Sequence, residues 1–134
     1  MILIVSSRFD KTGEVIKGLQ DSCIQFLNNK KESFDLFEVP GAVELPIAIQ
    51  ELMLKDPLKY EVAIALGCVI KGESDHYEWV TSSCRDGLGR VALKLGKPVV
   101  QGVLACPNEA LAIARKNLGA EYAHTAIEMR DLLS

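Results

Sequence analysis

The 134-residue chain contains few residues of the kinds that build metal centres or disulfide frameworks. Its four cysteines are scattered without a CxxC pair, and its two histidines, His76 and His124, are widely separated in the sequence. This spacing offers no zinc-ligand set and favours reduced thiols in a cytoplasmic protein. No apolar run reaches the roughly 18 residues that suggest a membrane span. The apolar N-terminus has no basic segment ahead of it, which argues against a signal peptide.

The chain also has no excess of basic residues. Fifteen Lys and Arg against eighteen Asp and Glu give a net charge of −3, and the isoelectric point is about 5.4. Nucleic acid is therefore a poor candidate for the main partner, because a phosphate backbone attracts a basic surface. Apolar residues make up 49% of the chain and charged residues 25%, proportions that exclude a disordered protein. The length predicts a single domain over residues 1–134.

What the chain does have is a regular alternation of short apolar runs and longer helical patterns. The apolar runs predict strands at residues 1–6, 33–39, 60–67 and 98–104. The helical periodicity predicts helices at residues 12–27, 43–55, 76–95, 108–116 and 120–133. Thr12 is expected to cap the first of these helices.

This strict alternation predicts a four-stranded parallel sheet with helices on both faces, a flavodoxin-like three-layer α/β/α sandwich. Ligands bind such folds at the carboxyl ends of the strands. Four loops follow the predicted strands and become the candidate site: residues 7–10, 40–44, 68–76 and 105–108. Most of the unusual polar residues of the chain fall in these loops.

The loop after the third strand, with its flanking residues from Gly67 to Tyr77, reads GCVIKGESDHY. Ser74 or Asp75 could cap the following helix, and the free N–H groups of its first turn would then favour a phosphate. His76, expected in that turn, is a candidate for proton transfer at neutral pH. A histidine that only caps or contacts solvent is the alternative. No GxxxxGK[ST] or GxGxxG fingerprint accompanies the loop.

Other candidate residues lie where this fold would place a ligand. Glu44 follows a Pro-Gly turn whose backbone groups could bind an amide or uracil edge, although the helix dipole alone would also favour an acidic residue there. Phe9 could stack on a flat heterocycle or fold under its own loop. Arg115 could bind a phosphate with both guanidinium arms or contact only solvent. His124 is expected to be structural.

Two longer segments resemble the lumazine synthase family. Residues 37–46 read FEVPGAVELP and residues 65–77 read ALGCVIKGESDHY, similar to the family patterns VPGA(F)E(I)P and ALG-x-VI-(R/K)GE-(T/S)-x-H. SRFD at residues 7–10 is similar to the family's SRFN, and TAIEM at residues 125–129 is similar to its C-terminal helix. Because these motifs keep their order and spacing over nearly the whole chain, the resemblance is specific.

The resemblance implies the penultimate step of riboflavin biosynthesis, the synthesis of 6,7-dimethyl-8-ribityllumazine. Family members join 5-amino-6-(D-ribitylamino)uracil to 3,4-dihydroxy-2-butanone 4-phosphate, with loss of phosphate and water, and use no metal or organic cofactor. The resemblance also implies a homopentamer or an assembly of pentamers, in which each active site lies between neighbouring subunits.

The same resemblance assigns roles to individual residues. Phe9 would stack on the pyrimidine, and His76 would transfer protons. The remaining positions would bind the ribityl chain (Ala42, Val43 and Glu44), the uracil ring (Cys68, Val69 and Ile70) and the phosphate (Gly72, Glu73 and Ser74). Arg115 would bind the phosphate in the site of the neighbouring subunit.

The chain departs from the family pattern at several positions. Asp10 stands where the family often has Asn, and Leu118 stands where it often has Lys. Gln101, which we include among the substrate-binding residues, occupies a position where an aromatic residue is common. The segment between the last two helices is shorter than usual, so the match of Arg115 depends on where the shortening falls. The chain begins directly at its first strand, without the N-terminal arm of many members, and we expect a somewhat weaker ring.

Two other functions remain as alternatives. An archaeal-type riboflavin synthase has a related fold and uses the lumazine itself, but the stretch 72–76 favours a substrate that carries phosphate. A lumazine- or flavin-binding protein without catalysis is the second alternative, and His76 argues against it. A response-regulator receiver is excluded because no acidic pair ends the first strand.

Overall fold

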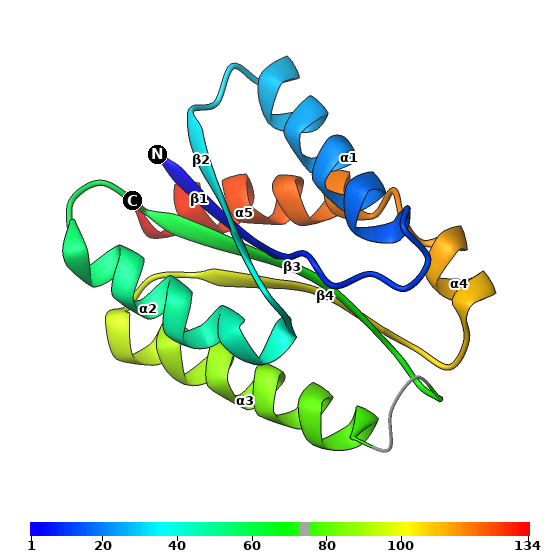
Figure 1. Cartoon of the computed structure of the whole chain (residues 1–134). Coiled ribbons are helices and arrows are strands. Elements are labelled where there is room, and N and C mark those ends of the chain that lie inside the picture. Colours follow the sequence, from blue (N-terminus) through cyan, green and yellow to red (C-terminus); the bar gives the residue numbers. More distant parts are fainter. Residues whose placement is uncertain (73–75) are drawn as a thin grey trace.

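The computed structural model describes residues 1–72 and 76–134 (Figure 1). The strands are β1 (Ile2–Ser7), β2 (Phe34–Val39), β3 (Val62–Ile70) and β4 (Val99–Cys106). The helices are α1 (Val15–Asn29), the short 3₁₀ turn η1 (Ala42–Glu44), α2 (Leu45–Lys55), α3 (Tyr77–Leu95), α4 (Glu109–Ala114) and α5 (Gly119–Leu133). Within the described ranges, no helix combines the length and apolar character needed to cross a membrane.

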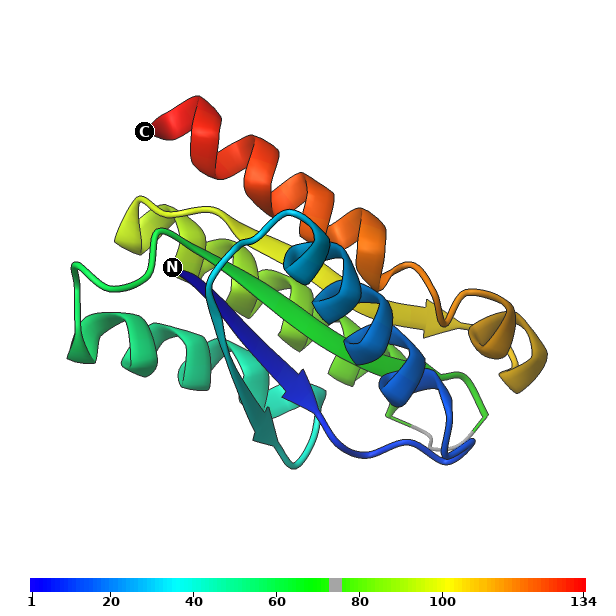
Figure 2. The same ribbon diagram turned by 90° about the horizontal axis from the view of Figure 1, so that it is seen from above.

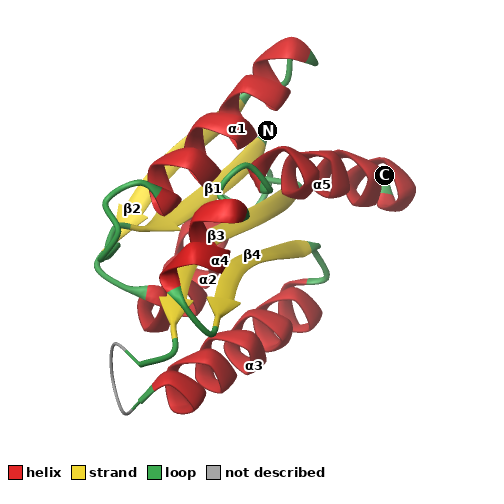
Figure 3. Cartoon of the chain, turned by 90° about the vertical axis from the view of Figure 1, so that its right-hand side faces the viewer, coloured by secondary structure: helices red, strands yellow, loops and turns green. Residues whose placement is uncertain are grey.

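The four strands form one parallel sheet in the order β2-β1-β3-β4. Helices α1 and α5 lie side by side over one face (Figure 2), and α2 and α3 cover the opposite face, so that the sheet is the middle of three layers (Figure 3). The predicted flavodoxin-like α/β/α sandwich is therefore confirmed. The inner strands β1 and β3 are buried along almost their whole length, as expected for parallel strands covered on both sides.

The side chains of β1 alternate between the two faces of the sheet, as the pleat requires. Ile2 and Ile4 pack against α1 and α5, whereas Leu3 and Val5 pack against α2 and α3. Helix α1 meets the first of these clusters through the predicted apolar positions Val15, Ile16, Leu19, Cys23 and Leu27, all of them buried. The sequence pattern alone thus identifies the buried face of this helix.

Two strands are longer than the sequence predicts. β3 continues to Ile70 and β4 to Cys106, so residues 68–70 and 105–106 are strand rather than loop. The two extensions pair with each other, from Cys68 beside Leu104 to Ile70 beside Cys106. Local composition does not report this pairing between segments distant in the sequence.

The start of α1 also differs from the expectation. The helix begins at Val15 rather than at residue 12, and Thr12 is not its N-cap. Thr12 Oγ1 accepts hydrogen bonds from the N–H groups of Glu14 and Val15 at 3.2 and 3.3 Å, while Asp10 Oδ2 accepts one from the Ile16 N–H at 2.7 Å. The Asp10 carboxylate, with Thr12, therefore holds the start of the helix.

Helix α3 ends where the sequence predicts. Gly96 follows its last residue in the left-handed conformation, with a φ of 64°, and glycine adopts this backbone without steric strain. At the other end, His76 precedes the first helical residue and occupies the N-cap position. The expectation that His76 lies within the first turn is therefore wrong by one residue.

Candidate active site

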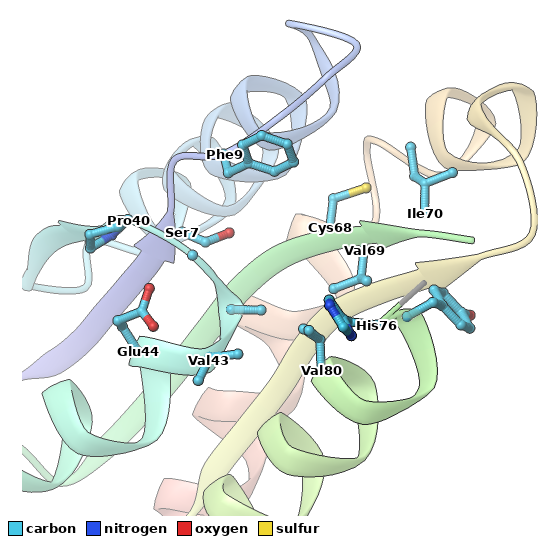
Figure 4. Close-up of a pocket in the computed structure, with 13 residues that line it drawn as sticks. Ser7, Phe9, Pro40, Val43, Glu44, Cys68, Val69, Ile70, His76 and Val80 are labelled. Carbon is cyan, nitrogen blue, oxygen red and sulfur yellow. The ribbon is translucent and has the colours of Figure 1, made fainter. Parts of the chain in front are cut away.

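A pocket of about 350 Å³ opens at the carboxyl ends of β1, β2 and β3 (Figure 4). Its size and mainly apolar wall fit a small organic ligand. It is lined by Ser7, Phe9, Pro40, Gly41, Ala42, Val43, Glu44, Cys68, Val69, Ile70, His76, Tyr77 and Val80.

Most of the predicted site residues line this one pocket. They come from four segments that are distant in the sequence: Phe9, the group Ala42, Val43 and Glu44, the group Cys68, Val69 and Ile70, and His76. The parallel topology brings them together because the carboxyl ends of the strands share one edge of the sheet. Gly72 follows β3 in a turn, with a φ of 95°, and the predicted phosphate residues Glu73 and Ser74 lie outside the described residues.

Phe9 lies beyond the end of β1 and is 60% exposed. Its ring stands over the pocket (Figure 4). The alternative, a ring folded under its own loop, is therefore wrong. An exposed aromatic face at a pocket mouth can stack on a planar heterocycle.

Glu44 is the last residue of η1 and is half-buried at the pocket wall. Within the described residues, its carboxylate forms no hydrogen bond or ion pair. A carboxylate in this state offers acceptors to the donors of a ligand. Its place beside α2 also satisfies the helix dipole, so the two interpretations of Glu44 are compatible.

The extended part of β3 forms another wall of the pocket. Between Gly67 and Ile70, one edge of β3 pairs with β4. Its other edge pairs with β1 as far as Leu66, and beyond Leu66 this edge borders the pocket. Backbone N–H and C=O groups along such a strand edge can hydrogen-bond the polar rim of a flat ring.

His76 lies exposed at the rim of the pocket, directly before α3. The His76 and Trp79 rings meet edge to face, with 6.4 Å between centroids and an interplanar angle of 70°. An accessible imidazole beside a ligand pocket can exchange protons with both ligand and solvent near neutral pH.

Gln101 and Arg115 do not line this pocket. Gln101 Nε2 donates a hydrogen bond to the Arg85 carbonyl at 3.4 Å and lines a smaller cavity, of about 170 Å³, beside α3 and β4. Arg115 follows the last residue of α4, and its Nη1 donates to the Cys106 Sγ at 3.8 Å. Their roles in substrate binding stay predictions.

The cysteines and other potential ligands offer little to a metal. Among the described residues, no group of three His, Cys, Asp or Glu side chains could hold a metal ion, and none of the cysteines forms a disulfide. Burial raises the pKa of Cys23 to about 12 and that of Cys84 to about 11. These two thiols are therefore protonated and unreactive near neutral pH.

Some pocket residues received no role from the sequence. Tyr77 and Val80 complete the wall, and Ser7 ends the buried strand β1 at the pocket floor. The available signal for Ser7 was the pair of small polar residues, Ser6 and Ser7, at the carboxyl end of an otherwise apolar strand.

Comparisons with known proteins show which family this chain resembles. The family model described as 6,7-dimethyl-8-ribityllumazine synthase matches residues 1–134. A protein of that name from Paraburkholderia phymatum is 41% identical over 133 residues, covering 96% of this chain and 75% of the relative. The Pyrococcus furiosus relative of the same name is 38% identical, covering 98% and 83%. The relative from Albidiferax ferrireducens is 37% identical with the same coverage. The chain belongs to the 6,7-dimethyl-8-ribityllumazine synthase family.

Proposed function

We propose that this protein is a 6,7-dimethyl-8-ribityllumazine synthase, a transferase of riboflavin biosynthesis. It would join 5-amino-6-(D-ribitylamino)uracil to 3,4-dihydroxy-2-butanone 4-phosphate, with loss of phosphate and water. One observation carries the proposal: residues from separate family motifs line a single pocket of suitable size in a chain that matches the family over its whole length.

The condensation of the two substrates requires mainly that the protein orients them and transfers protons. Imine formation, phosphate elimination and ring closure each move protons between nitrogen, carbon and oxygen, and each requires the two substrates to be held together. We assign the proton transfers to His76 at the pocket rim and the stacking of the pyrimidine to Phe9. Both placements are supported by the exposure of these rings beside the pocket.

The remaining pocket residues would divide the first substrate between them. We assign the ribityl chain to Ala42, Val43 and Glu44, because the Glu44 carboxylate can accept hydrogen bonds from hydroxyl groups. The uracil ring would bind along the segment 68–70, where the edge of β3 borders the pocket.

The phosphate of the second substrate would bind at Gly72, Glu73 and Ser74. The support is the place of this segment in the sequence shortly before α3, because the amino end of a helix carries free N–H groups and the positive end of the helix dipole. Gly72 contributes a turn with positive φ, which keeps the backbone free of a side chain at this point.

We further propose that the smallest active unit is a homopentamer with shared sites, in which Gln101 and Arg115 complete the pocket of the neighbouring subunit. Both residues lie outside the pocket of their own subunit. Helices α2 and α3 expose large apolar side chains, among them Ile47 and Leu93. A subunit interface would cover such side chains.

We also propose that residues 1–134 act as one domain in the cytoplasm. The strands of the described residues share a single sheet, and each face of that sheet carries one core cluster. The cysteines form no disulfides within the described residues, in keeping with a reducing compartment.

A direct assay tests the function. Purified protein is incubated with both substrates while the absorbance and fluorescence of the lumazine are followed, and accumulation of the lumazine is the expected result. Conversion of added lumazine to riboflavin would favour the archaeal-type riboflavin synthase instead. Binding of the lumazine without turnover would favour a binding protein.

A further inference from the structure

The two serines that end β1 are both buried and differ in their hydrogen bonds. Ser6 is 0% exposed and Ser7 is 1% exposed. Gln20 Nε2 of α1 donates to Ser6 Oγ at 2.9 Å, and Ser6 Oγ donates to the Ser7 carbonyl at 2.9 Å. Ser7 Oγ has no hydrogen-bond partner among the described residues. Buried hydroxyl groups in native proteins nearly always have a partner, so this one requires an explanation.

Ser7 faces the pocket, whereas Ser6 faces α1. The pleat turns the side chain of Ser7 to the face of Leu3 and Val5, and the residue lines the pocket floor. In Figure 4 its oxygen points toward the side of the pocket where Phe9 and Cys68 lie. On the neighbouring strand, a Cβ added to Gly67 would lie 3.0 Å from Ser7 Oγ. The glycine therefore leaves room for this hydroxyl.

The surroundings of Ser7 favour a neutral ligand group with hydroxyls. No lysine or arginine is among the described residues that line the pocket, and the nearby Glu44 carboxylate repels a phosphate. A carboxylate can only accept hydrogen bonds, whereas a serine hydroxyl both donates and accepts. The hydroxyl groups of a polyol have the same dual capacity, so they can pair with Ser7 and Glu44 together.

We infer that Ser7 is a further substrate-binding residue, whose hydroxyl hydrogen-bonds a hydroxyl of the ribityl chain on the pocket floor. The inference rests on the proposed function and adds a residue to that site. The ligand hydroxyl would supply the hydrogen-bond partner that Ser7 Oγ does not have among the described residues.

The test compares Ser7→Ala with Ser6→Ala as a matched control from the adjacent position. For Ser7→Ala we expect the KM for the ribitylaminouracil to rise about three- to tenfold, the loss of one neutral hydrogen bond. Its KM for the butanone phosphate and its thermal midpoint stay unchanged. Ser6→Ala lowers the thermal midpoint, because Gln20 loses its acceptor, and leaves both KM values unchanged. An unchanged KM for the ribitylaminouracil in Ser7→Ala overturns the inference.

A substrate analogue locates the contact within the ligand. In 5-amino-6-(pentylamino)uracil an alkyl chain replaces the ribityl chain, so wild type and Ser7→Ala should bind it equally. An equal loss for both ligands in Ser7→Ala would place the contact on the ring and overturn the inference.

Should wild type show no turnover, the proposed function fails by itself, and direct titration with 6,7-dimethyl-8-ribityllumazine decides the inference. Weaker binding by Ser7→Ala supports it. Equal binding, or no binding by either protein, overturns it.

Discussion

The two faces of the sheet are packed in different ways. On one face, α1 and α5 approach each other so closely that a Cβ added to Gly119 would lie 2.0 Å from the Leu19 carbonyl oxygen. An ion pair from Arg130 to Glu32 and another from Lys116 to Glu14 join these helices or their flanking segments. Within the described residues, α1 exposes no large apolar side chain.

The opposite face is less closed. The turn η1 and the start of α3 line the candidate pocket. Helices α2 and α3 leave Ile47, Leu54, Trp79 and Leu93 exposed. The comparison teaches that the closest helix contact and the ion pairs between helices lie on one face, while the candidate pocket lies on the other. Substitutions on the α1–α5 face should therefore change stability, and substitutions around the pocket should change activity.

The largest effect on stability is expected from Gly119→Ala. The new methyl group would overlap the Leu19 carbonyl of α1, and backbone cannot move away cheaply. We expect a loss of about 3 kcal/mol in the free energy of unfolding, or failure to fold. Urea unfolding measures the change. The matched control is Gly89→Ala on α3, where nothing lies within 4 Å of an added Cβ and alanine should stabilise by about 0.5–1 kcal/mol. Similar losses at both positions would contradict the contrast between the faces.

The largest effect on activity is expected from His76→Ala. Removal of a general acid–base group should lower kcat by about 10²-fold, while residual activity persists because the pocket still holds both substrates together. Steady-state kinetics and a thermal melt distinguish this loss from unfolding. His124→Ala is the control, because His124 lies on α5 beside Phe26, and it should leave kcat unchanged. A loss of all substrate binding in His76→Ala would argue for a structural role instead.

A mixture of two impaired chains tests whether Arg115 of one subunit completes the site of its neighbour. Arg115→Ala and His76→Ala each impair every site in their own homo-oligomer. If one subunit supplies His76 and the next supplies Arg115, random mixing restores both in about a quarter of the sites. After the two variants are refolded together, we expect about a quarter of the wild-type activity. When they are mixed without refolding, we expect no more than the sum of the activities of the two variants. Absence of rescue would mean self-contained sites. An active monomer by light scattering would also contradict sharing.

The sequence predicts the local features of both faces well and their tertiary details poorly. The apolar period of residues 12–27 identifies the buried face of α1, and the motif residues identify most of the pocket wall. The extensions of β3 and β4 depend on each other, which no local pattern reveals. Ser6 and Ser7 look alike in the sequence, and only the position of Gln20 and the pocket distinguish them. Glu73 and Ser74 lie outside the described residues, so their roles stay predictions.

The smallest effect concerns Asp10, at the start of α1. Burial raises the pKa of this carboxyl, but hydrogen bonds from Thr12, Ile16 and Gly13 outweigh it, so the pKa lies below its ordinary value. Because the pKa of Asp10 is lower in the folded state, its carboxylate stabilises the fold at pH values above the unfolded pKa of about 4. This stabilisation is lost as the pH falls through the pKa of the folded state.

Asp10→Asn should therefore lose about 1 kcal/mol of stability at pH 7, because the amide lacks the negative charge and one of the two oxygens that accept hydrogen bonds from Thr12 and Ile16. Its stability should also fall less steeply than that of the wild type below about pH 4. Chemical unfolding of both proteins from neutral to acidic pH measures the two slopes. The control is Asp21→Asn, whose carboxylate forms only an exposed pair with Lys17 on the same helix, and which should change stability by less than about 0.5 kcal/mol. Equal dependence of stability on pH in wild type and Asp10→Asn would contradict this prediction. It would show that the charge of Asp10 does not stabilise the start of α1 and that Thr12 holds it alone.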